Sequence, residues 1–212
     1  DGRQVRLTYW VPARDEETSI GLLLDGLCDP LDPTGRPDQI VVVDDHSTDR
    51  TAAVASAYPG VQVVAAPPLP DGWTGKSWAC HTGTSHARVP TDVGPDSVVV
   101  FLDADVRVQR EALARVVGER DARGGLVSVQ PWHQTERPYE QLSCLFNVLA
   151  VMGTAMGSRG GATGAFGPVL VSSWSDYDAV GGHAAVHADI VEDLALARNF
   201  RDAGLPVEVL EG

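Results

Sequence analysis

Two short apolar runs, each followed at once by carboxylates, constrain the fold of this 212-residue chain more than any other feature. Residues 40–43 are continuously apolar and precede Asp44 and Asp45, and residues 97–102 precede Asp103 and Asp105. A short, continuous, β-branched run is typical of a parallel strand covered on both faces. Open α/β sheets bind ligands at the carboxyl ends of such strands. We therefore expect these carboxylates at one edge of one sheet, in a functional site.

Strand-like and helix-like segments alternate along the rest of the chain. We predict strands at 5–11, 40–43, 61–65, 97–102, 126–130, 169–172 and 206–210. We predict helices at 16–27, 51–58, 76–88, 110–120, 139–156 and 189–203. Helix 16–27 has apolar residues at helical spacing, and helix 189–203 has Ile190, Leu194 and Ala197 on one face. This order predicts one α/β domain over residues 1–212, with a mostly parallel sheet and helices on both faces.

The net charge of −13 excludes a nucleic-acid-binding protein, because such proteins need a basic face to neutralise phosphates. The same charge is compatible with binding a single nucleotide. A divalent cation can bridge acidic side chains to a diphosphate. We therefore expect no nucleic-acid partner and a small phosphorylated ligand instead.

The pair Asp103 and Asp105 suggests a metal site. In an extended segment, residues two apart point the same way, so both carboxylates can face one cation. Mg²⁺ and Mn²⁺ prefer oxygen ligands and often leave positions free for substrate phosphates. The alternative is a turn that ends the strand and caps the next helix. We favour Mg²⁺ or Mn²⁺ binding because a second acidic strand end accompanies the first.

Three other segments carry candidate binding or catalytic groups. At residues 44–49, Asp44 and Asp45 can accept hydrogen bonds from a base or ribose, although a residue among 47–49 can simply cap the next helix. Arg14 and Lys76 are candidates for phosphate contact. Glu192 and Asp193 begin a predicted helix, where the helix dipole alone favours acids. Asp193 is equally suited to act as a general base, with Glu192 pointing elsewhere.

Together these segments resemble the family 2 glycosyltransferases of the GT-A fold, a Rossmann-type α/β architecture. The matching segments are V-P-A-R-D-E-E at 11–17, V-V-V-D-D-H-S-T-D at 41–49, F-L-D-A-D at 101–105 and V-E-D-L-A-L-A-R at 191–198. The segment P-D-G-W-T-G-K at 70–76 looks like the bacterial branch that glycosylates carotenoids and hopanoids. The match in order and spacing spans nearly the whole chain.

The resemblance implies an inverting transfer of a sugar from a nucleoside diphosphate-sugar, a UDP-sugar, to a hydroxyl of a lipid or other apolar acceptor. It implies that Pro12, Ala13 and Glu16 line the nucleotide pocket and that Asp44 contacts the base. It also implies that Asp103 and Asp105 form the metal-binding pair, with Asp105 the more direct ligand, and that Asp193 is the catalytic base.

Two other functions stay open at this point. A sugar nucleotidyltransferase uses a similar fold, but it usually has a basic, glycine-rich loop where this chain has V-P-A-R-D-E-E. A non-catalytic domain that binds nucleotide-sugars or lipids is the second alternative.

The apolar stretch 139–156, and an end just after a strand-like run, indicate a domain from a longer membrane-associated protein. Many relatives carry a later Q-x-x-R-W-type motif and transmembrane helices. We expect the parent protein on the cytoplasmic side of a membrane, with possible contact between this domain and the membrane surface. We expect the domain alone to be soluble.

Overall fold

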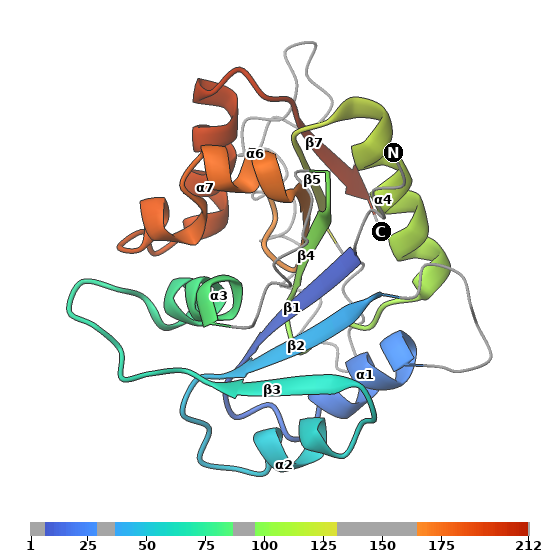
Figure 1. Ribbon diagram of the computed structural model, residues 1–212, viewed down its shortest axis with the longest axis vertical. Coiled ribbons are helices and arrows are strands. Elements are labelled where there is room, and N and C mark those ends of the chain that lie inside the picture. The colour runs from blue at the N-terminus through green and yellow to red at the C-terminus, as the bar shows by residue number, and fades with distance from the viewer. Residues whose placement is uncertain (1–6, 29–36, 87–95, 131–164, 212) are drawn as a thin grey trace, which may run out of the picture.

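The computed structural model describes residues 7–28, 37–86, 96–130 and 165–211 (Figure 1). Its strands are β1 (Leu7–Ala13), β2 (Gln39–Asp44), β3 (Val61–Ala65), β4 (Val98–Leu102), β5 (Leu126–Gln130), β6 (Val169–Ser173) and β7 (Val207–Glu211). Its helices are α1 (Ile20–Cys28), α2 (Thr51–Ser56), α3 (Gly75–His86), α4 (Arg110–Arg123), α6 (Trp174–Ala179), the 3-10 helix η2 (Gly182–Val186) and α7 (Glu192–Asp202). All seven predicted strands are present, with ends that differ from the prediction by at most two residues.

The seven strands form one sheet in the order β3-β2-β1-β4-β6-β5-β7. The pairs β1–β2, β1–β4, β2–β3 and β5–β7 are parallel, whereas β6 is antiparallel to both of its neighbours. The predicted mostly parallel α/β sheet is therefore confirmed. The reversal at β6 was not predicted, because a strand buried along its whole length has the same apolar pattern in either direction.

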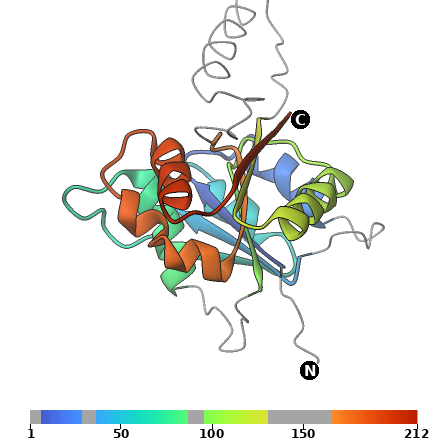
Figure 2. The ribbon, with the colours of Figure 1, turned by 90° about the horizontal axis from the view of Figure 1, so that it is seen from above.

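Helices cover both faces of the sheet, as predicted (Figures 1 and 2). Successive strand residues point to opposite faces, so Tyr9 and Val11 belong to one core and Trp10 to the other. The first core contains the buried residues of α1, α2 and α4. The second contains those of α3, α6 and α7. The α1 residues in the first core are the four whose spacing predicted this helix: Ile20, Leu23, Leu24 and Leu27.

Helix α7 differs from its prediction in where it begins and in which face it buries. It begins at Glu192, and its buried apolar residues are Leu196, Ala197 and Phe200. Ile190 precedes the helix and is 90% exposed, and Leu194 is 37% exposed, so neither shares the buried face on which Ala197 lies. Leu196 and Phe200 lie four residues apart, which places them together against the second core.

The segment between β6 and α7 forms two short helices that the sequence pattern did not predict, α6 and η2. The Ser173 hydroxyl caps α6 by accepting a hydrogen bond from the Asp176 N–H. The Tyr177 hydroxyl and the buried His183 Nδ1 are 2.7 Å apart, which ties α6 to η2. Burial lowers the pKa of His183 to about 3, so this imidazole is neutral. These contacts fix the path by which the chain reaches α7.

The predicted helix 139–156 lies outside the described residues. Most of the glycine-rich stretch 157–167 that follows it in the sequence also lies outside them. Within the described ranges, no helix combines the length and apolar character that crossing a bilayer requires.

Candidate active site

The carboxyl ends of β1, β2 and β4 meet at one edge of the sheet. These strands are parallel neighbours, and the register places Ala13 at the end of β1 beside Asp44 at the end of β2. Asp103 directly follows β4. The two acidic strand ends therefore share one edge, as predicted.

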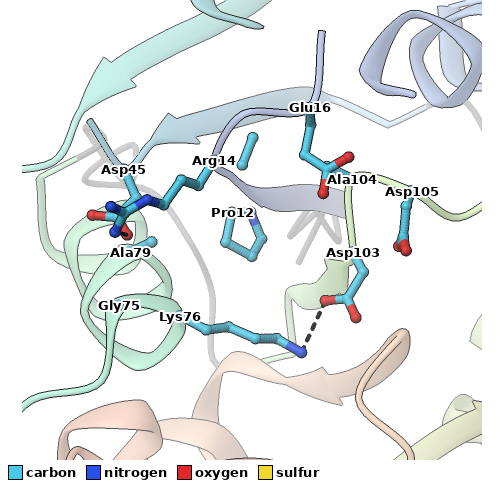
Figure 3. A pocket seen from close by; sticks show the side chains of 11 residues that line it. Pro12, Arg14, Glu16, Asp45, Gly75, Lys76, Ala79, Asp103, Ala104 and Asp105 are labelled. Atoms are coloured by element: carbon cyan, nitrogen blue, oxygen red, sulfur yellow. Dashed lines mark ion pairs between the residues drawn. The ribbon is translucent and has the colours of Figure 1, made fainter. Parts of the chain in front are cut away.

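A pocket of about 360 Å³ opens at this edge (Figure 3). Eight of the residues singled out from the sequence line it: Pro12, Ala13, Arg14, Glu16, Asp45, Lys76, Asp103 and Asp105. The remaining lining residues, Gly75, Ala79 and Ala104, have small or no side chains and were not identified from the sequence. Figure 3 shows Arg14 beside Asp45 in one part of the pocket and Asp103 with Asp105 in another.

Near Arg14, an ion pair and hydrogen bonds join the loop after β1 to the loop after β2. Arg14 Nη1 lies 3.5 Å from the buried carboxylate of Asp45. The Asp15 carboxylate accepts a hydrogen bond from the Thr48 N–H, and the Thr51 hydroxyl accepts one from the Glu16 N–H. The Asp15 carboxylate and the Glu16 N–H therefore join the two loops at the pocket rim, and the Glu16 carbonyl accepts a hydrogen bond from the Ile20 N–H at the start of α1.

The structure shows what two candidate residues, Asp44 at the end of β2 and Asp49 in the loop after it, contact. Asp49 accepts a hydrogen bond from the Thr51 N–H, so it satisfies the first turn of α2 as the capping alternative expected. Asp44 does not line the pocket, and its Oδ1 is buried without a hydrogen-bond donor in the described part of the chain. A buried acceptor without a donor is costly, so this oxygen remains available to a ligand donor.

The Asp103–Asp105 segment is a turn rather than an extended strand. The Val106 N–H donates to the Asp103 carbonyl at 3.2 Å, which closes the turn. Our argument that both carboxylates point the same way because the segment is extended was therefore wrong. Both nevertheless line the pocket, with Asp105 exposed and Asp103 half-buried.

Lys76, in the first turn of α3, joins the pocket to the start of α7. Its Nζ lies 2.9 Å from Asp103 Oδ1, 3.3 Å from Glu192 Oε1 and 3.6 Å from Asp193 Oδ2. Glu192 and Asp193 are not among the pocket-lining residues, but Lys76 places them directly beside it. Our expectation that Glu192 points away from Asp193 was wrong, because both carboxylates at this helix start reach the same ammonium group.

Burial governs the charge states in this cluster. It raises the pKa of Asp193 to about 7, since the attraction of Lys76 only partly offsets the cost of a buried charge. Burial likewise raises the pKa of Asp103. For Lys76, burial favours the neutral form, but the attraction of Asp193 and Asp103 outweighs it and raises the pKa of the ammonium group. Near neutral pH, Lys76 is charged and Asp193 can gain or lose a proton.

Two glycines, Gly167 and Gly75, allow this close packing, and neither was identified from the sequence as a site residue, although each lies in a glycine-containing segment, 157–167 and 70–76. A Cβ on Gly167 would collide with the Asp193 carboxylate and would lie 2.8 Å from Lys76 Nζ. A Cβ on Gly75 would lie 2.7 Å from Asp45 Oδ2. A side chain at either position would therefore displace a candidate site residue.

The residues present fit a divalent cation as a partial ligand set. Among the described residues, no three His, Cys, Asp or Glu side chains come together as a complete metal site. Asp103 and Asp105 supply hard oxygen ligands at the open pocket. Mg²⁺ in particular is commonly held by one or two carboxylates together with substrate phosphates.

The sequence comparison identifies a family and a group of relatives. The sequence model of glycosyl transferase family 2 matches residues 9–166. A 4,4'-diaponeurosporenoate glycosyltransferase of Staphylococcus aureus is 39% identical over 214 aligned residues, covering 97% of this chain and 54% of the relative. The chain thus spans about half the length of the curated relatives it matches.

The fold comparison agrees with the sequence comparison. A mannosyltransferase of Pyrobaculum calidifontis, solved with GDP-Man and Mn²⁺, has a TM-score of 0.68 at 23% identity, covering 99% of this chain and 56% of that one. Glucosyl-3-phosphoglycerate synthase of Mycobacterium tuberculosis, solved with Mn²⁺, UDP and its product, has a TM-score of 0.63 at 22% identity, covering 99% and 70%. At these identities the likeness concerns the fold, which is that of the GT-A glycosyltransferases.

Proposed function

This chain belongs to glycosyl transferase family 2, and from that premise we propose that it transfers a sugar from a UDP-sugar to an apolar acceptor with inversion at the anomeric carbon. One observation carries the proposal. Lys76 brings Asp103, at the end of β4, together with Glu192 and Asp193, at the start of α7. A donor-side carboxylate and a candidate base thus meet beside one pocket.

The nucleotide would bind on the β1 and β2 side of the pocket. Pro12, Ala13 and Glu16 would line its surface, and Asp44 would accept a hydrogen bond from the base. The unpartnered Asp44 Oδ1 supports this role, because a base N–H would satisfy it. Arg14 and Lys76 would lie near the phosphates, where cationic side chains are favourable.

Asp103 and Asp105 would hold a divalent cation, Mg²⁺ or Mn²⁺, with the phosphate oxygens completing its ligands. When bound, the cation would neutralise charge on the departing nucleoside diphosphate. Two of the solved structures that share this fold contain GDP-Man with Mn²⁺ and UDP with Mg²⁺, which supports this part of the proposal.

Asp193 would act as the general base. The hydroxyl oxygen of the acceptor attacks the anomeric carbon, the hydroxyl proton passes to the Asp193 carboxylate, and the bond to the diphosphate breaks with its electron pair leaving on the phosphate oxygen. Among the residues that the structure describes, none donates a hydrogen bond to Asp193 Oδ1, which supports its role as proton acceptor. A pKa of about 7 suits a general base at neutral pH. A single displacement of this kind inverts the anomeric configuration.

The acceptor would be a lipid or another apolar molecule. The Staphylococcus aureus relative is named for its action on 4,4'-diaponeurosporenoate, a carotenoid acid, and the sequence match covers nearly all of this chain. Because an apolar acceptor resides in bilayers, we propose that the complete protein works at the cytoplasmic face of a membrane.

A donor screen tests the function. Purified protein would be incubated with Mn²⁺ or Mg²⁺, 4,4'-diaponeurosporenoate or other apolar acceptors, and a panel of UDP- and GDP-sugars. Released nucleoside diphosphate and glycosylated acceptor would be measured together. We expect both products in equal amounts with a UDP-sugar. Donor binding by calorimetry without either product would favour a non-catalytic binding domain. Pyrophosphate release from a nucleoside triphosphate and a sugar phosphate would favour a nucleotidyltransferase.

A further inference from the structure

At the start of α7, acidic side chains are buried and apolar side chains are exposed, which is the opposite of an ordinary surface helix. Glu192 and Asp193 point inward to Lys76, with side chains only 9% and 13% exposed. The apolar side chains around them face solvent: Ile190 is 90% exposed, Val191 53% and Leu194 37%. The described part of the chain exposes five large aliphatic side chains, and three of them fall within these five residues.

A second partly apolar segment lies against this one. The Thr74 N–H donates to the His187 carbonyl at 2.9 Å, and the Trp73 and His187 rings are 5.1 Å apart. These contacts join the loop before α3 to the loop before α7, and Figures 1 and 2 show both loops at the same side of the molecule. The loop before α3 also carries Leu69, which is exposed. The apolar surface therefore extends from α7 towards the aromatic residues beside α3.

We propose that Ile190, Val191 and Leu194 bind the hydrocarbon part of the acceptor and so place its reacting oxygen beside Asp193. The inference rests on the proposed function, and it names the residues that select an apolar acceptor. Val191, the N-cap of α7, and Leu194, in its first turn, are both exposed, whereas the two carboxylates between them are largely buried against Lys76. An acceptor lying along the apolar side would have its polar end next to the base.

The charge of the segment favours an uncharged chain over a lipid headgroup as its ligand. Residues 187–194 contain no Lys or Arg, whereas Asp189, Glu192 and Asp193 are all acidic. Segments that adhere to anionic membrane surfaces use clusters of basic residues. The segment thus offers apolar contact without electrostatic attraction to such a surface, as a hydrocarbon acceptor requires.

Binding of a fluorescent polyene tests the proposal in the full-length protein. The probe is cis-parinaric acid, whose emission rises in an apolar environment. We expect the double variant Ile190→Ser/Leu194→Ser to bind the probe ~10-fold more weakly than the unsubstituted protein, because two apolar contacts are lost. Leu22→Ser is the matched control, since Leu22 is 47% exposed on α1, against the other face of the sheet. The control should bind the probe like the parent, and all three proteins should bind UDP equally and melt at similar temperatures.

Several results would overturn the proposal. These are no probe binding by the parent, unchanged binding by the double variant, or an equal loss in Leu22→Ser. A double variant that loses only self-association, or only binding to phosphatidylcholine vesicles, would assign the surface to a second copy or to a bilayer. A different result would contradict the proposed function alone: the unsubstituted protein binds the probe through these residues but transfers sugar to no acceptor.

Discussion

Replacing Asp193 by asparagine removes a carboxylate that becomes ionised near physiological pH. Burial raises its pKa from an ordinary 3.8 to about 7, so the ionised form grows as the pH rises through neutrality. Only the ionised form can accept a proton from the acceptor. In the parent protein, kcat/KM should therefore rise with pH and reach half of its plateau near pH 7.

The size of both effects follows from this assignment. One unit below the pKa, only about a tenth of the molecules carry the ionised carboxylate, so kcat/KM should fall ~10-fold there. Asparagine keeps the shape of the side chain but cannot accept the proton. General-base catalysis contributes ~100-fold or more, and each tenfold corresponds to ~1.4 kcal/mol of activation free energy. We expect Asp193→Asn to lose at least that factor at the plateau and to lose the rise with pH.

The assay is the initial rate of nucleoside diphosphate release with saturating metal and donor, over about three pH units around 7. Donor affinity, measured by calorimetry, should change little, because Asp193 is not assigned to the donor. Glu192→Gln is the matched control, since Glu192 contacts the same Lys76 Nζ and should keep the rise with pH. A rise that persists in Asp193→Asn, or a variant whose main defect is donor binding, would refute the assignment.

Three further predictions concern the neighbours of Asp193. Asp105→Ala should abolish the strengthening of UDP binding by Mn²⁺, and equal affinity with metal and with chelator in the parent protein would contradict the metal site. Lys76→Gln should move the rise of kcat/KM to higher pH, because Lys76 lowers the pKa of Asp193. Lys76→Arg should leave the rise near its position in the unsubstituted protein. A pH profile that does not move in Lys76→Gln would count against this coupling. Gly167→Ala should reduce turnover by ~10-fold or more, because its Cβ would displace the Asp193 carboxylate. Gly118→Ala, in open space on α4, should instead raise stability by up to ~1 kcal/mol with unchanged turnover, and similar effects of the two alanines would reject the packing argument.

The sheet and its acidic edge could be predicted because their signals are local. A buried parallel strand needs a continuous apolar run, and 40–43 and 98–102 are such runs. Parallel neighbours bring their carboxyl ends together, which is why Asp45 and Asp103 line one pocket although 58 residues separate them. Eight of the eleven candidate residues line that pocket, seven of them because they lie at or just after these strand ends, whereas Lys76 reaches it from the first turn of α3.

The features of the fold and site that were not predicted depend on contacts between segments far apart in the sequence, which a local pattern does not encode. The residues of β6 do not encode its direction, because a strand that is buried along its whole length has the same apolar pattern in either direction. The inward orientation of Glu192 arises because Lys76, on α3, attracts both carboxylates of the α7 start. The same arrangement leaves Ile190 and Leu194 exposed, although helical periodicity alone placed them on one face with Ala197, which is buried. The role of Gly167 becomes visible only once Asp193 lies against it.

Mass analysis of lipids from a host that makes an apolar acceptor tests the central claim most directly. Extracts would be compared between cells expressing the full-length parent protein and cells expressing Asp193→Asn. We predict that the parent yields apolar molecules carrying one added sugar and that the variant yields few or none. An extract without sugar-bearing apolar products in the presence of active, folded protein would contradict the account, as would equal product from both proteins.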